Sequence, residues 1–328
     1  MPTRQGITRR TMLGTGLALA AAGPTKAQSD YPSRAITIVV PFPPGGSSDV
    51  VTRLVAARLA ENLKANVVIE NRGGGGGVPA AIGIKQATPD GYTLFLANNG
   101  LFAIMPALTP DIRFDPVKDF QPITPLFAFP SVLVVPSGSP AKSVKELVAL
   151  AKSKPGGLNY ASQGVGSGGH ILGEMLRLKS GAPFVHVPYR GAGPAVTDLA
   201  AGNVDLLFSS YVSAIGQVQA GKFRMLGWTA TKRSAALPDV PTMAEAGFPG
   251  VELEIWQGIV APLGTPAAIV RKLNEEFIKA AKSPDIVAKV AAQGVDMYTT
   301  TPEELAKLIA ADVERLGKVI RDAGIKVQ

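Results

Sequence analysis

The segment PFPPGGSSD has the composition of an anion-binding loop at the start of a helix. Adjacent glycines let backbone N–H groups approach a ligand closely, and the beginning of a helix adds about half a positive charge. A helical pattern of apolar residues follows from Asp49, which is placed to cap that helix. The alternative is an ordinary proline–glycine turn. The candidate ligand-binding residues of this first loop are Phe42, Gly45, Gly46, Ser47, Ser48 and Asp49.

A second loop, SQGVGSGGH, places four glycines and two serines ahead of another predicted helix. This composition again suits an anion cradle. The alternative is a Ser/His nucleophile pair, but no G-x-S-x-G motif accompanies it, and His170 is better explained as a residue at the helix start. The candidates from this second loop are Ser162, Gly166, Ser167 and His170.

A third loop, PYRGAG, and one asparagine complete the polar candidates. Tyr189 offers an aromatic wall, and Arg190 offers a guanidinium suited to carboxylates. The alternative for Arg190 is a salt bridge between two lobes. Asn99 follows a predicted strand and could add polar contacts to the same cleft.

Composition excludes several other kinds of site. The chain has no cysteine, which excludes disulfides, thiol nucleophiles and iron–sulfur clusters. It has only two histidines, so we do not expect a histidine-rich metal site. The formal charge of the 328 residues is +8. Residues 1–28 hold four basic groups and no acidic one, so the remainder keeps 29 basic against 25 acidic groups, or +4. A small positive net charge without a run of basic residues favours small anions over nucleic acid as ligands.

The first residues predict an export signal. A basic start, an apolar run from Thr11 to Gly23 and the small-x-small site TKA follow the order of a secretory signal peptide, and the run is too short for a membrane anchor. The stretch TRRTML resembles a twin-arginine motif. We therefore expect residues 1–27 to be removed and the mature protein to be periplasmic.

Alternating apolar periods predict an α/β architecture built on largely parallel sheets. Ser143 and Glu146 have the spacing of a capping box at one helix start. Proline-punctuated breaks at 122–130 and 229–241 divide the chain into a first lobe, 28–127 with 230–328, and a second lobe, 128–229. Predicted strands are 34–40, 67–70, 92–97, 132–135, 158–161, 184–187 and 204–208, and predicted helices begin at 49 and occupy 79–86, 144–151, 170–178, 266–282, 284–293 and 302–322.

Short motifs spread over the mature chain carry a family resemblance. YPSR, PFPPGGSSD, ENR, PDGYTL, FDP, VPYRG, LPDVPT, EAG and APLGTP occur in this order. With them the chain resembles Bug-type receptors, the extracytoplasmic solute-binding proteins of tripartite tricarboxylate transporters. The resemblance implies a two-lobed type II periplasmic-binding-protein fold that closes on a ligand, whose carboxylate is held by backbone amides and waters between the first and second loops. Members take up citrate, dicarboxylates, acidic amino acids and aromatic acids.

Two departures from the family pattern bear on the ligand. Ser209 and Ser210 follow a strand after which the family often has Asp, so a cationic group would lack a partner and a carboxylate without an amine is expected. Leu101 and Phe102 stand where the family often has small or polar residues. Together with Phe42 and Tyr211 they would make an apolar wall for an aromatic or aliphatic body.

The resemblance implies a receptor rather than an enzyme, with no cofactor and no metal. Its expected partners are a small carboxylate (a di- or tricarboxylate or an aromatic acid) and membrane permease subunits, and we expect a monomer. Two alternatives remain: a ligand-reporting partner of a sensor kinase, and an exported hydrolase using Ser167 and His170.

Overall fold

The computed structural model describes residues 31–109, 111–129, 131–189, 191–233, 237–291 and 295–326. The predicted signal peptide and Arg190 lie outside the described residues. Across these ranges, no helix has both the length and the apolar character that crossing a membrane requires.

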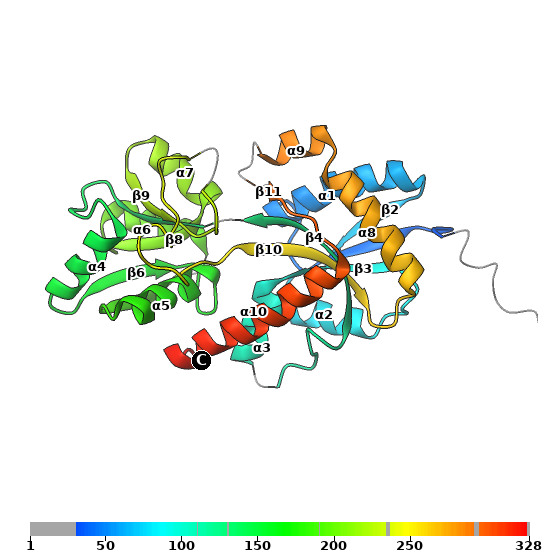
Figure 1. Cartoon of the computed structure of the whole chain (residues 1–328), viewed down its shortest axis with the longest axis horizontal. Coiled ribbons are helices and arrows are strands. Elements are labelled where there is room, and N and C mark those ends of the chain that lie inside the picture. Colours follow the sequence, from blue (N-terminus) through cyan, green and yellow to red (C-terminus); the bar gives the residue numbers. More distant parts are fainter. Residues whose placement is uncertain are drawn as a thin grey trace, which may run out of the picture.

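Two β-sheets, each covered by helices, lie side by side and define two lobes (Figure 1). Lobe 1 surrounds the six-stranded sheet, ordered β11-β4-β10-β3-β1-β2, and lobe 2 surrounds the five-stranded sheet, ordered β7-β6-β8-β5-β9. The first sheet consists of β1 (Ile36–Val40), β2 (Val67–Asn71), β3 (Thr93–Asn98), β4 (Phe120–Phe129), β10 (Ile255–Pro262) and β11 (Asp296–Met297). The second consists of β5 (Ser131–Pro136), β6 (Leu158–Ser162), β7 (Phe184–Pro188), β8 (Leu206–Ser210) and β9 (Phe223–Trp228).

The expectation of largely parallel sheets is wrong, because both sheets are mixed. β1 pairs in parallel with β2 and β3, and β6 pairs in parallel with β7 and β8. The strands next to the lobe crossings, β4, β10 and β5, pair antiparallel with their neighbours. A chain that leaves one sheet along a strand and returns along another must place these two strands in opposite directions.

The stretch 122–130, predicted as a break, contains most of strand β4. Its prolines are accommodated at irregular positions, since the β4–β10 register shifts between Gln257 and Gly258, opposite Pro125, and between Ile259 and Val260, opposite Pro122. Proline lacks the N–H that a regular ladder uses, so it is tolerated where the pairing is already interrupted.

The helices largely follow the predicted periodicity. Ser143 Oγ accepts a hydrogen bond from the Glu146 N–H (3.2 Å), as the capping-box spacing predicts. The prediction omitted β9, β10, β11, α7, the helical turn after β2 and the helical turns after β3. The helices are α1 (Ser47–Leu63), α2 (Val78–Lys85), α3 (Met105–Leu108), α4 (Val144–Ser153), α5 (Gly168–Ser180), α6 (Ala192–Ala201), α7 (Tyr211–Gln219), α8 (Ala267–Ala281), α9 (Pro284–Ala291) and α10 (Pro302–Ala323), with short helical turns η1 (Gly75–Gly77) and η2 (Gly100–Ile104).

Helix α10 runs from lobe 1 toward lobe 2 (Figure 1). Leu305 belongs to an apolar cluster of lobe 1, whereas Leu316 belongs to a cluster built mainly from lobe 2. Polar contacts fasten the helix to the chain that returns between the lobes: Trp256 Nε1 donates to Asp312 Oδ2 (2.8 Å), and Arg315 Nη1 donates to the Glu252 carbonyl (2.7 Å). The two lobes therefore share packed apolar structure along α10.

Candidate ligand-binding site

The first loop joins the end of β1 to the start of α1. Gly45 has φ of +84°, a left-handed conformation that favours glycine. Gly46 is the N-cap of α1. A Cβ atom added to Gly46 would have one neighbour within 4 Å among the described residues, the Pro43 carbonyl oxygen at 3.8 Å. The prediction that Asp49 caps this helix is wrong: the chain turns at Gly45, α1 begins at Ser47, and Asp49 is its third residue.

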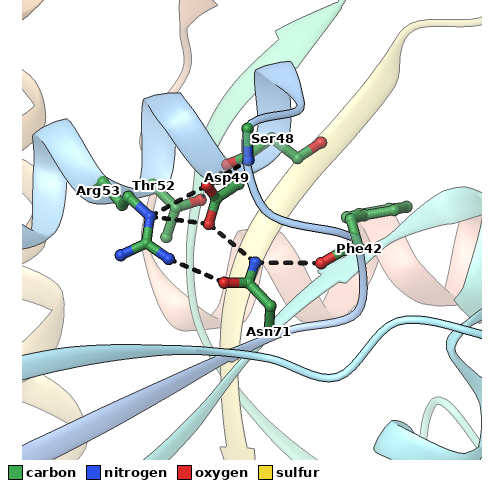
Figure 2. A network of polar contacts seen from close by, with 7 residues as sticks. Phe42, Ser48, Asp49, Thr52, Arg53 and Asn71 are labelled. Carbon is green, nitrogen blue, oxygen red and sulfur yellow. Dashed lines mark hydrogen bonds and ion pairs between the residues drawn. The ribbon is translucent and has the colours of Figure 1, made fainter.

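Asp49 instead fixes the shape of the loop (Figure 2). Its carboxylate accepts from the Gly45 N–H (2.9 Å), from Asn71 Nδ2 (2.8 Å) and from Arg53 Nε (3.0 Å to each oxygen). Asn71 Nδ2 also donates to the Phe42 carbonyl (3.1 Å), and Arg53 Nη2 donates to Asn71 Oδ1 (2.8 Å). The two ends of the loop are thereby tied to β2 and α1.

The Asp49 carboxylate is almost fully buried, yet it remains charged. Burial by itself would raise its pKa, but hydrogen bonds from Arg53, Gly45 and Asn71 together outweigh burial and lower the pKa. Because Arg53 neutralises it at contact distance, Asp49 does not leave an uncompensated negative charge beneath a candidate anion site. The contacts that the structure gives this carboxylate all hold the loop in place.

Ser48 presents a hydrogen-bond donor beside the loop. Gln257 Nε2 donates to Ser48 Oγ (2.9 Å), so the Ser48 O–H remains available to donate to another acceptor. Gln257 Oε1 is buried and has no hydrogen-bond partner within the described ranges. Asn71 was predicted only as part of the ENR motif and Gln257 not at all, because each acts through a tertiary contact with the loop.

The second loop is held by its own side chains. Ser167 is the N-cap of α5: its Oγ accepts from the His170 N–H (3.3 Å) and donates to the Gly164 carbonyl (2.7 Å). His170 Nδ1 accepts from the Gly166 N–H (3.1 Å). Both the Ser167 hydroxyl and the His170 ring are thus engaged with backbone, which does not support the Ser167–His170 nucleophile pair.

His186 on β7 joins this loop, although it was not predicted to do so. Its ring stacks on that of His170, with centroids 3.7 Å apart and 8° between the planes, and its Nε2 lies 2.6 Å from Ser162 Oγ. Burial lowers the pKa of both histidines to about 4, and His170 adds to the lowering at His186. At neutral pH both rings are uncharged, so attraction for an anion in this region must come from N–H and O–H donors.

The remaining predicted residues lie in different environments. Tyr189 donates from its hydroxyl to Asp198 Oδ2 (2.6 Å) and stays within lobe 2. Asn99 and Ser209 are buried, and Asn99 Oδ1 and Ser209 Oγ have no partner among the residues that the structure describes. Leu101 is buried in the apolar cluster of lobe 1, and Phe102 packs against Phe114 and Phe120 in the same cluster. The predicted apolar wall therefore does not include Phe102, whose ring completes the core.

A cavity of about 470 Å³ lies between the start of α1 in lobe 1 and the start of α7 in lobe 2. It brings together three predicted residues, Phe42, Gly46 and Ser48, with six others. Four of those six come from β4, α7 and β10. The sequence predicted a break where β4 lies, and it predicted neither α7 nor β10. They are Pro43, Phe129, Ser210, Val212, Ser213 and Ile255.

The second loop reaches the same boundary between the lobes. A Cβ atom added to Gly166 would lie 2.6 Å from Leu108 Cδ1 on α3. A Cβ atom added to Gly168 would lie 2.8 Å from Cδ1 of Ile255, which also lines the cavity. The loop backbone is therefore packed closely against residues of lobe 1 and of the returning chain. Backbone N–H groups in the first turn of a helix have no partner within that helix. The start of α1, the Ser48 hydroxyl and the cavity can together accept an anionic group with an attached body.

Comparisons with known proteins identify the family to which the chain is similar. The family described as "Tripartite tricarboxylate transporter family receptor" matches residues 51–325. Protein BugT of Bordetella pertussis is 35% identical over 323 residues, which cover 97% of this chain and 99% of that protein.

Two solved structures with named ligands are similar over most of their length. R. palustris Rpa4515 with adipate is 35% identical with a TM-score of 0.77, and the match covers 90% of this chain and 99% of that one. MatC from Rhodopseudomonas palustris with bound malate is 34% identical with a TM-score of 0.71, and covers 88% and 100%. These likenesses confirm the predicted fold class, the two-lobed α/β fold of periplasmic binding proteins.

Proposed function

The chain belongs to the tripartite tricarboxylate transporter receptor family, and from this premise we propose that it captures a small carboxylate between its lobes and delivers it to membrane permease subunits. It acts as a periplasmic, non-enzymatic receptor without a cofactor. In this proposal residues 1–27 are removed on export. Lobe 1 then comprises 28–127 and 230–328, lobe 2 comprises 128–229, and the protein works as a monomer.

The observation that supports carboxylate capture best is the cavity between α1 and α7. Gly46 and Ser48 at one end lie at a helix start, where N–H groups and the helix dipole favour an anion. Asp49, Arg53 and Asn71 hold this loop in place before a ligand arrives, which lowers the entropic cost of binding.

The lining also supports a ligand without an amine. None of the described residues that line the cavity has a carboxylate side chain. A protonated amine placed there would lose its water without gaining a charged partner. The relatives whose structures contain adipate and malate are in keeping with a carboxylate as the ligand here.

A receptor releases its ligand chemically unchanged, which separates it from an exported hydrolase. The purified protein is incubated with a carboxylate that it binds, or with its methyl ester, and the recovered small molecule is identified by mass spectrometry. We expect the acid to be retained on the protein and both molecules to be recovered intact. Hydrolysis of the ester that is lost in Ser167→Ala would contradict the proposal.

Delivery to a permease is tested separately. Permease subunits of a tripartite tricarboxylate transporter are placed in lipid vesicles, and uptake of labelled carboxylate is followed with and without the receptor. Uptake that requires the receptor is the expected result, and equal uptake without it would contradict delivery.

A further inference from the structure

The cavity between the lobes has walls that are mostly apolar. Phe42, Phe129 and Ile255 line it from the side of lobe 1 and the returning chain, and all three are only partly buried. Val212 on α7 lines the opposite side and is 39% exposed. Two phenylalanines, an isoleucine and a valine left partly open around one cavity form an apolar surface that a ligand can cover.

The polar groups of the cavity are distributed unevenly. Gly46 and Ser48 stand at the start of α1, where the proposed function places the carboxylate. At the other end, Ser210 Oγ and Ser213 Oγ lie 2.7 Å apart, and Ser210 Oγ also accepts from the Ser213 N–H (3.4 Å). In this pair one hydroxyl donates to the other, so one O–H of the two is left to donate at this end of the cavity. The space between the two ends is bounded by hydrocarbon.

A compact hydroxy acid fits this lining poorly. Its hydroxyl would have to leave water for a surface of phenylalanine, isoleucine and valine, which is unfavourable without a hydrogen-bond partner. A hydrocarbon body gains instead, because it covers the apolar walls and removes them from water. The volume of about 470 Å³ lies within the range found for small-molecule sites.

We propose that this cavity is a subsite for the apolar body of the ligand, and that the chain takes carboxylates with an unsubstituted hydrocarbon body of four or more carbons between or beyond their carboxyl groups. This inference rests on the proposed function and specifies its substrate class. Val212 is a specificity-determining residue, because it alone among the four apolar side chains comes from a helix of lobe 2.

The test is a titration calorimetry series on the full-length mature protein with succinate, adipate, suberate and malate. Each fully buried methylene tightens binding by about fourfold, so adipate, with two methylenes more than succinate, should bind about sixteenfold more tightly, and suberate more tightly again. Malate should bind no more tightly than succinate. Equal or weaker binding with increasing length, with succinate or malate still bound, would overturn this inference and leave the receptor function standing. A lack of binding by every carboxylate would count against the proposed function itself.

A matched pair of variants assigns the effect to the subsite. Val212→Thr keeps the shape of the side chain but places a hydroxyl in the cavity, and we expect suberate to bind about fourfold less tightly with less than a twofold change for succinate. Val185→Thr makes the same change at a valine of β7 that is 48% exposed and is not among the residues lining the cavity, and it should alter neither ligand. Equal losses for succinate and suberate in Val212→Thr, or equal effects of the two variants, would remove Val212 from the subsite.

Discussion

Replacing Asp49 by alanine tests whether the first loop is held in place by the network beneath it. The substitution removes the acceptor for the Gly45 N–H, for Asn71 Nδ2 and for Arg53 Nε. Asn71 keeps its bond to the Phe42 carbonyl, and the Arg53 side chain, which is 48% exposed, can turn to water.

The expected cost follows from these contacts. Hydrogen bonds to a charged group contribute about 1.5–3 kcal/mol each when they are buried, but the Arg53 contact is discounted because water can replace it. The other two bonds are only partly buried, so water also replaces some of their contribution, and we expect Asp49→Ala to lower the free energy of unfolding by about 2–4 kcal/mol. Asp49→Asn, which keeps the shape and loses the charge, should cost about 1–2 kcal/mol.

Ligand affinity should fall as well, because the Asp49 network holds the loop at the end of the cavity. A loop that is no longer ordered in advance must be ordered on binding, and we expect at least a tenfold weaker affinity for adipate, equivalent to about 1.4 kcal/mol. The assays are urea unfolding at pH 7 and titration calorimetry.

Glu61→Ala is the matched control, because Glu61 lies on the same helix, forms an ion pair with Arg58 and is 65% exposed. It should change unfolding by less than about 1 kcal/mol and leave affinity unaltered. If Asp49→Ala behaves like Glu61→Ala in both assays, the loop does not depend on the Asp49 network and the reasoning is refuted.

Two further predictions concern the loop and the histidines. Gly46→Val should abolish most carboxylate binding at a stability cost of about 1 kcal/mol or less, because its φ of −73° admits a side chain, which would then occupy the end of the cavity. Gly138→Val is the control: this glycine also has open space around it, and the change should leave binding intact. Preserved affinity in Gly46→Val would exclude the loop from the site. His170 and His186 have folded-state pKa values of about 4, below their ordinary value of 6.5, so the unfolded chain binds more protons between these pH values. The free energy of unfolding should thus be fully retained above pH 6.5 and fall by up to about 1.4 kcal/mol per pH unit per histidine down to about pH 4. Urea unfolding at pH 7, 6 and 5 measures this slope, which His186→Gln should roughly halve; a flat profile would contradict burial of the uncharged pair.

Local sequence signals predicted the elements that depend on local interactions. The strand at β1, the amphipathic helix α10 and the Ser143 cap rest on β-branched runs, apolar periodicity and N-cap chemistry, all of which act within a few residues. The glycine and serine composition likewise indicated that the first loop precedes a helix, although α1 starts two residues earlier than the pattern suggested.

The errors occur where distant segments decide the outcome. Strand β4 contains two prolines and was predicted as a break, yet pairing with β10 places them at irregular positions in the ladder. Phe102 looked like a cleft residue, and only the fold reveals that Phe114 and Phe120 enclose it. Such pairings join residues far apart in the chain, and no local pattern encodes them.

The candidate site shows the same division. Phe42, Gly46 and Ser48 could be predicted because they share one short motif, but the opposite wall, including Val212, comes from a helix whose pattern was not recognised. Asp49 was identified for its position near a helix start, whereas one of its partners, Asn71, is the last residue of strand β2, 22 residues away.

Thermal unfolding with matched acids and amides tests carboxylate capture most directly. The purified mature protein is heated with adipate and suberate, and with the corresponding uncharged diamides, each at concentrations up to the millimolar range. A ligand at 100 times its dissociation constant adds about 2.7 kcal/mol, which should raise the midpoint by a few degrees for the acids and leave it unchanged for the diamides. An equal rise with the diamides, or no rise with any carboxylate, would contradict capture of a carboxylate between the lobes.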